Sequence, residues 1–147
     1  MKKIGFLFCL TSLFIFSCET PEDILNNLDH TVPVVRFEND SITVNAGEQV
    51  SAGIIIEDES GIDRIVFSYP NWIINEVIEV DDKTIQTYTF TVTFHVPEDA
   101  LTEWEEDFIY NDGTTIKISQ RYHRLKVTAW DNHRNMGSGD LYVKVRE

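Results

Sequence analysis

The sequence predicts an all-β sandwich of about seven to nine strands. Three observations support this prediction. Apolar and polar residues alternate with a period of two after residue 31, and turn-forming residues separate the alternating stretches. Only residues 97–107 suit a helical turn, and a short one. A period of two is the pattern of a strand that buries one face, so a sheet-based core follows.

The first half of the domain contains one strong strand and four weaker ones. The strong strand is 50–56, in which Val50, Ala52, Ile54 and Ile56 fall on one face and are expected to point inward. Weaker alternation predicts strands at 34–38, 41–45, 65–69 and 72–80. Turn residues separate these strands at 38–40, 45–47, 59–61 and 81–82.

The second half begins with the clearest strand, 88–96. Its aromatic and β-branched positions share one face, while threonines and His95 occupy the other. Asn111-Asp112-Gly113 predicts the tip of a β-hairpin that joins 108–110 to 114–118. Alternation then predicts strands at 125–129 and 141–145, with Leu125 and Val127 buried.

Residues 1–17 have the composition of a signal peptide. Lys2 and Lys3 precede an apolar run that ends at residue 16, which is shorter than the roughly 20 residues of a membrane span. The run closes with Ile15-Phe16-Ser17-Cys18, which resembles the lipobox of bacterial lipoproteins. That resemblance implies cleavage before Cys18, acylation at Cys18 and anchoring to the membrane. An ordinary secretory peptide with an incidental cysteine is the alternative.

Cleavage would leave 130 of the 147 residues, enough for one domain. Residues 18–31 are polar and acidic and predict a lipidated tether, and residues 32–147 hold the sandwich domain. Losing the two signal lysines leaves 10 basic against 25 acidic residues, a net charge of −15. Such a charge repels phosphate backbones and excludes nucleic-acid binding as a function. Cys9 is lost with the signal, so the domain has no disulfide.

Four short segments, 32–34, 45–50, 57–62 and 129–135, carry a family resemblance. Their order is similar to that of bacterial immunoglobulin-like modules, and more closely to Ig-like lipoproteins of unknown function from the Bacteroidota, over residues 32–147. His133 and Arg134 depart from the usual Asp-x-x-Gly-Asn pattern, and 101–120 reads as an insertion. The resemblance implies an immunoglobulin-like β-sandwich. Together with acidic residues after Cys18, it implies an outer-membrane protein at the cell surface.

Carboxylates and amides gather in two predicted turns. In an Ig-like sandwich, the loop after the second strand and the loop before the last strand emerge at the same end. Calcium takes about six to eight oxygen ligands, so these turns form a candidate calcium site. Its members are Asp58, Glu59, Asp63, Asp131, Asn132 and Asn135. The alternatives are turn capping through backbone N–H groups and ion pairing with Arg64 or Arg134. No cofactor is otherwise required.

Trp104 and Tyr110 are candidate ligand-binding residues, because flat aromatic faces stack on sugar rings. Trp104 stands among strongly solvated acidic neighbours, whereas Trp72 beside Pro70 is expected to pack over the edge of the core. The alternative for Trp104 is that it anchors the inserted segment to the sandwich.

Patterns of catalysis are weak in this chain. The four histidines have no metal-type spacing with a second histidine or a cysteine, and Ser60-Gly61 lacks the flanking pattern of a nucleophile elbow. We expect no enzymatic activity. The sequence predicts a lipid-anchored, non-catalytic binding or adhesion module for an extracellular glycan or protein. The alternative is a structural accessory subunit of an outer-membrane complex.

Overall fold

The computed structural model describes residues 31–146. They form ten strands and one short 3-10 turn, and the fold is all-β. The predicted signal peptide, Cys18 and nearly all of the predicted tether lie outside the described residues. No helix within 31–146 is long and apolar enough to cross a membrane.

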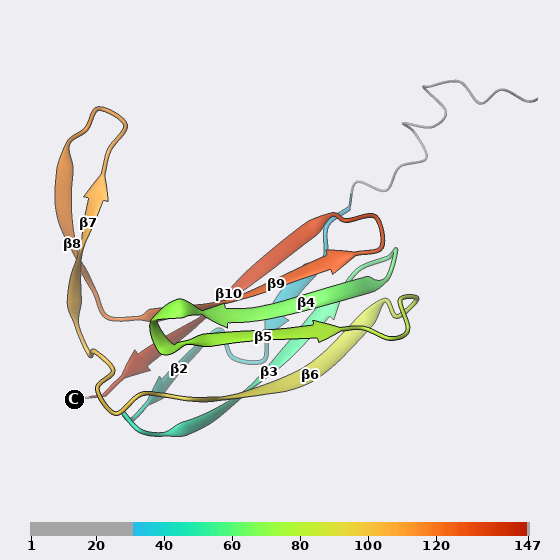
Figure 1. The fold of residues 1–147 in the computed structure, drawn as a ribbon, viewed down its shortest axis with the longest axis horizontal. Helices are drawn as coiled ribbons and strands as arrows, with labels where there is room; N and C mark the ends of the chain where they lie inside the picture. Colours follow the sequence, from blue (N-terminus) through green and yellow to red (C-terminus); the bar gives the residue numbers. More distant parts are fainter. Residues whose placement is uncertain (1–30, 147) are drawn as a thin grey trace, which may run out of the picture.

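Eight of the strands form two sheets that lie one over the other (Figure 1). The smaller sheet has the order β1-β3-β6 and is antiparallel throughout. It consists of β1 (Val34–Phe37), β3 (Gln49–Glu57) and β6 (Thr87–His95). The larger sheet has the order β2-β10-β9-β4-β5, in which only the β2–β10 pair is parallel. It consists of β2 (Ser41–Val44), β4 (Ile62–Tyr69), β5 (Ile74–Glu79), β9 (His123–Asp131) and β10 (Met136–Val145).

The core lies between the two sheets and follows the period of two. The smaller sheet contributes Ile54, Ile56, Val92 and Phe94. The larger sheet contributes Phe67, Leu125, Val127, Leu141 and Val143. All nine side chains are buried, so the predicted inward faces of these strands are confirmed. Burying each such side chain contributes about 1.5–3 kcal/mol, which is how a domain without a disulfide is held together.

Strand β4 begins at Ile62, three residues before its predicted start. A β-bulge between Ile62 and Arg64 shifts the register of β4 against β9. Ile62 and Ile65 are both fully buried, although a regular strand would place them on opposite faces. Because the bulge interrupts the alternation, the sequence pattern identifies only the part of the strand that follows it.

The predicted helical turn in 97–107 is reduced to a single hydrogen-bonded turn, in which the Ala100 N–H donates to the Pro97 carbonyl at 3.1 Å, and no helix follows it. The described residues instead place their 3-10 turn at Pro70–Trp72, η1, which ends at Ile73 with a left-handed φ of 56°. Proline suits the first position of such a turn because it has no N–H to leave unsatisfied. Residues from Trp104 onward are extended, since they pair with a second strand.

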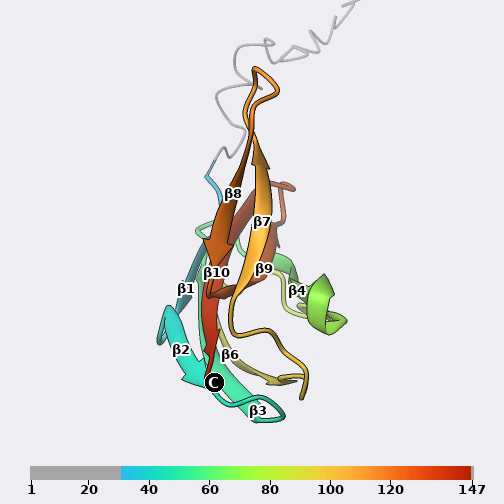
Figure 2. The same ribbon diagram turned by 90° about the vertical axis from the view of Figure 1, so that its left-hand side faces the viewer.

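That pair is a two-stranded hairpin, β7 (Trp104–Ile109) and β8 (Thr115–Gln120), which projects away from the sandwich (Figures 1 and 2). Its tip is the predicted one. Gly113 has a positive φ of 85°, and the Asp112 carboxylate accepts the backbone N–H of Thr114 at 2.9 Å. Residues 104–120 therefore form an arm that projects from the sandwich.

Candidate functional site

The two acidic turns meet at one end of the sandwich, as the sequence predicts. Ser60 connects them: its hydroxyl donates to Asp58 Oδ1 at 2.6 Å and lies 3.3 Å from Asp131 Oδ2. Asn132 Nδ2 donates to the Ser60 carbonyl at 2.7 Å. The β3–β4 and β9–β10 loops are therefore joined by direct hydrogen bonds.

Asp131 builds the β9–β10 turn. Its side chain is only 1% exposed. Oδ1 accepts the backbone N–H groups of His133 at 2.8 Å and Asn135 at 2.7 Å, and Oδ2 accepts Asn135 Nδ2 at 2.7 Å. Asp58 caps its own loop in the same manner, since its Oδ1 accepts the Ser60 N–H at 2.9 Å. Both aspartates therefore carry the turn chemistry that was the alternative to metal binding.

One carboxylate oxygen in this cluster has no protein partner. Asp58 Oδ2 is buried and unbonded, in a side chain that is 7% exposed. Within 31–146, no group of three or more His, Cys, Asp or Glu side chains is placed to hold a metal ion. A cation here would therefore need backbone carbonyls or amide oxygens in addition to Asp58. The calcium site stays a prediction.

Asp63, another predicted ligand, is engaged elsewhere. Asp63 pairs with Lys83, which raises the pKa of that lysine above its ordinary value, first through the hydrogen bond and then through the charge of the carboxylate. Arg64 does not neutralise the acids but lies over the Trp130 ring, 4.2 Å from its centroid. Asp63 therefore forms its ion pair with Lys83, which is distant in sequence from this turn, and not with the neighbouring Arg64.

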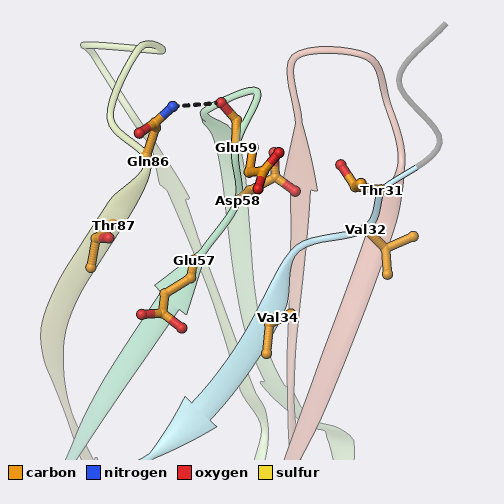
Figure 3. Close-up of a pocket in the computed structure, with 8 residues that line it drawn as sticks. All are labelled: Thr31, Val32, Val34, Glu57, Asp58, Glu59, Gln86 and Thr87. Atoms are coloured by element: carbon orange, nitrogen blue, oxygen red, sulfur yellow. Dashed lines mark hydrogen bonds between the residues drawn. The ribbon is translucent and has the colours of Figure 1, made fainter.

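A cavity of 380 Å³ lies beside the acidic turns (Figure 3). Its wall includes Asp58 and Glu59 from the loop after β3, and Val32 and Val34 from the start of the domain. Gln86 closes the other side by donating to the Glu59 carbonyl at 2.7 Å. The Glu59 side chain is exposed, and its backbone oxygen makes this structural bond.

His123 lies at the base of the hairpin and is 4% exposed. Its Nε2 is 2.7 Å from the Leu101 carbonyl, which can only accept, so Nε2 carries the proton. Nδ1 lies 2.8 Å from the Tyr69 hydroxyl and in the neutral ring accepts from it. That hydroxyl in turn accepts Asn71 Nδ2 at 3.1 Å.

Burial keeps this network in its neutral form. Desolvation lowers the pKa of His123 below its ordinary value, against a smaller opposing effect of the hydrogen bond to Leu101. Desolvation also raises the pKa of Tyr69 above its usual value near 10. In these neutral forms, Tyr69 donates its hydroxyl proton to His123 Nδ1, and His123 Nε2–H donates to the Leu101 carbonyl. The hydrogen bonds therefore all run in one direction, from Asn71 through Tyr69 and His123 to Leu101.

Trp104 anchors the hairpin to the sandwich. Its ring stacks on His123 with centroids 4.6 Å apart and planes at 27°, and its Nε1–H donates to Glu106 at 2.8 Å. The His123 ring in turn packs on the Trp72 ring, with centroids 4.5 Å apart. The Trp72 ring stacks on Phe94 of the core, with centroids 6.2 Å apart. The predicted packing of Trp72 at the core edge is confirmed, and the anchoring alternative describes Trp104.

Tyr110 lies at the other end of the hairpin, so the two candidate ligand-binding aromatics do not form one site. Tyr110 follows the end of β7 and meets Phe108 edge to face at 5.1 Å. In a strand, residues two apart share a face, and the β7–β8 register places Phe108 opposite Ile116 and Glu106 opposite Ile118. Residues 104, 106, 108, 110, 116, 118 and 120 therefore make up one face, which we call the even face.

The even face meets the larger sheet in a hollow of 510 Å³, which we call the corner pocket. Its aromatic lining residues are Tyr69, Trp104, Tyr122 and Tyr142. Its polar lining residues are Asn71, Glu106, Gln120 and Arg124. Sequence reasoning singles out Trp104 among these residues but does not connect it with Tyr142 or with any of the four polar residues. They come from five separate segments, and no local pattern connects them.

Comparison with known proteins gives no indication of what the corner pocket or the acidic turns bind. A scan against models of known protein families found no match to this chain, and searches of curated proteins and of solved structures found none either.

Proposed function

We propose that this chain is a lipid-anchored, non-catalytic binding module with an immunoglobulin-like sandwich, which docks on a protein partner through the β7–β8 hairpin. Cys18 would hold the domain at the outer membrane, facing the cell surface, and the acidic tether would separate it from the lipid. The observation that carries the proposal is the exposed apolar surface on the outer part of the even face.

Four apolar side chains form this surface. Phe108, Tyr110, Ile116 and Ile118 are 37–49% exposed, and they adjoin along and across the two strands. Grouped aromatic and aliphatic side chains are typical of the buried centre of a protein interface. The aliphatic pair favours a protein over a glycan here, because isoleucine presents no flat ring for a sugar.

The hairpin also lacks the support that isolated hairpins need. A two-stranded hairpin alone is marginally stable in water. Among the described residues, β7 and β8 pair with no third strand, and their opposite face carries the exposed ion pairs Glu105–Lys117 and Glu103–Arg121. Exposed pairs contribute about 0–1 kcal/mol each. A partner that covers the even face would supply the missing packing.

Site-resolved cross-linking tests the proposal. A photoreactive amino acid is placed at position 108, 116 or 109 of the full-length protein, and cells that express it are irradiated. Positions 108 and 116 share the even face, whereas Ile109 is 67% exposed on the opposite face and is the matched control. We expect one discrete protein adduct from 108 and 116, at least tenfold stronger than from 109.

Equal adducts from all three positions, or none from 108 and 116, would contradict docking through the even face. A second test replaces both Phe108 and Ile116 with serine. Because both side chains are partly exposed, the domain should keep its cooperative thermal unfolding while an adduct formed at position 118 is lost. Ile109→Ser should leave that adduct unchanged.

The same surface would serve the alternative function, an accessory subunit of an outer-membrane complex. A lasting apolar contact is typical of permanent complexes. In that case the adduct would contain an integral outer-membrane protein, and deleting this chain would reduce the amount of the larger complex.

A further inference from the structure

The corner pocket brings together aromatic rings from distant parts of the chain. Trp104 stands at the base of the hairpin, Tyr69 ends β4, and Tyr142 lies on the outer face of β10. Tyr142 is 41% exposed and meets the Tyr122 ring at 6.5 Å, edge to face. Aromatic faces carry partial negative charge, so they attract the partly positive C–H groups of a ligand that lies flat against them.

The polar groups of the corner pocket are planar and several are already oriented. Asn71 is held by its bond to the Tyr69 hydroxyl, and Glu106 by its bond from Trp104. Amides donate and accept, a carboxylate accepts, and a guanidinium donates. A hydroxyl group both donates and accepts. A mixed set of Asn71, Glu106, Gln120 and Arg124 therefore suits a ligand with many hydroxyl groups.

The charge of the pocket selects against anions. Glu106 and Arg124 are the charged residues that line it, so their formal charges cancel, and Arg124 also lies 3.7 Å from the Asp140 carboxylate. The chain as a whole carries −13, which repels an approaching anion. Phosphate or sulfate recognition would need several uncompensated donors. A neutral ligand meets neither obstacle.

We propose that the corner pocket binds a neutral saccharide. A pyranose has an apolar C–H face for the aromatic rings and hydroxyl groups along its edge for the four polar side chains. The volume of 510 Å³ lies within the range of about 300–1,000 Å³ that small-ligand sites occupy. This site goes beyond the proposed function, because protein docking uses residues toward the tip of the hairpin and the saccharide uses its base.

Affinity electrophoresis of the full-length protein in detergent tests the site. Native gels contain dextran, amylopectin, galactomannan or xyloglucan as neutral probes, and alginate or hyaluronan as acidic ones. We expect at least one neutral polysaccharide to retard the protein and neither acidic one to do so. Tyr142→Ala should weaken the apparent affinity at least tenfold, while Tyr142→Phe, which keeps the ring, should retain most of it.

Tyr110→Ala is the matched control, since Tyr110 is 47% exposed and lies at the hairpin tip. It should bind like the wild type. Gln120→Ala gives a second measure of the pocket should Tyr142→Ala melt at a lower temperature than the wild type. No retardation by any neutral probe, retardation by acidic probes alone, or equal binding by all variants would each overturn the saccharide site.

One further outcome would assign the corner pocket to protein docking. If Tyr142→Ala weakens the cross-link formed at position 108 and no polysaccharide retards the protein, the saccharide proposal is wrong and the interface extends to the hairpin base. The two proposals fail separately, because loss of the position-108 adduct says nothing about retardation in a polysaccharide gel.

Discussion

At the scale of single residues, burial decides what the polar side chains do. His123 is buried between Trp72 and Trp104, with a bond at each ring nitrogen. A charged imidazolium could no longer accept the Tyr69 hydroxyl at Nδ1, and its charge would lie in a desolvated site. The neutral ring therefore belongs to the structure that attaches the hairpin to the sandwich.

The depressed pKa of His123 predicts a loss of stability in acid. The unfolded chain has a histidine pKa near 6.5, and the folded pKa is lower. As the pH falls below about 6.5, the unfolded state binds the proton first, so the free energy of unfolding decreases down to the folded pKa. Chemical denaturation between pH 8 and pH 5 should show a steeper decrease for the wild type than for His123→Gln.

The exposed His95 provides the control for that experiment, because His95→Gln should keep the wild-type dependence on pH. Parallel curves for the wild type and His123→Gln would show that His123 has no share in the acid sensitivity.

Asp58 offers a sharp test of calcium binding. Asparagine at position 58 keeps an acceptor oxygen for Ser60 but removes the carboxylate charge and the second oxygen, which lacks a protein partner. If calcium binds there, it should raise the melting temperature of the wild type. At a calcium concentration of 100 times Kd, binding would increase the free energy of unfolding by about 2.7 kcal/mol. Asp58→Asn should abolish that rise. A wild-type melting temperature that is the same in calcium and in chelator would exclude the site.

At the scale of elements, backbone contacts decide where strands can cross. The start of the domain lies against β10 so closely that a Cβ on Gly137 would be 1.7 Å from the Pro33 carbonyl oxygen. Since the Pro33 oxygen is a backbone atom and a Cβ is fixed directly to the backbone, neither can move aside as the end of a flexible side chain would. Glycine at 137 is thus a condition for β1 to lie across β10.

A pair of glycine substitutions separates this contact from ordinary turn strain. Gly137→Ala should destabilise the domain by more than about 3 kcal/mol, since relief of the clash requires a backbone shift. Gly113→Ala has open space around it but a φ of 85°, and should cost about 1–2 kcal/mol. Urea denaturation measures both. A Gly137→Ala variant as stable as Gly113→Ala would refute the close crossing.

At the scale of the whole molecule, the described domain is a two-sheet sandwich from which the β7–β8 hairpin projects. The proposed lipid anchor, Cys18, lies near the N-terminus of the sequence. A lipid at Cys18 and a tether through residue 31 would leave the sandwich and its hairpin free to meet partners near the membrane. The net charge of −15 after cleavage would keep the domain away from anionic lipid. Attachment would then depend on the lipid alone.

Cys18→Ala therefore should release the protein from the membrane. Fractionation of cells should move it from the membrane pellet to the soluble fraction, because without acyl chains nothing offsets the repulsion of an acidic domain. The matched control is Cys9→Ala, which lies within the predicted signal peptide and should leave attachment intact. A Cys18→Ala protein that stays in the pellet would contradict the lipobox interpretation.

The sequence by itself determined most of the strands, their inward faces and the hairpin tip, because alternation and turn chemistry are local properties of the chain. The resemblance to an Ig-like sandwich also predicted that Asp58 and Asp131 lie at one end of the domain. Tertiary structure alone decided the bulge at Ile62, the pairing of Asp63 with Lys83, and the corner where Trp104 meets Tyr142. These features depend on how closely distant segments pack, and a pattern with a period of two carries no information about contacts between residues tens of positions apart.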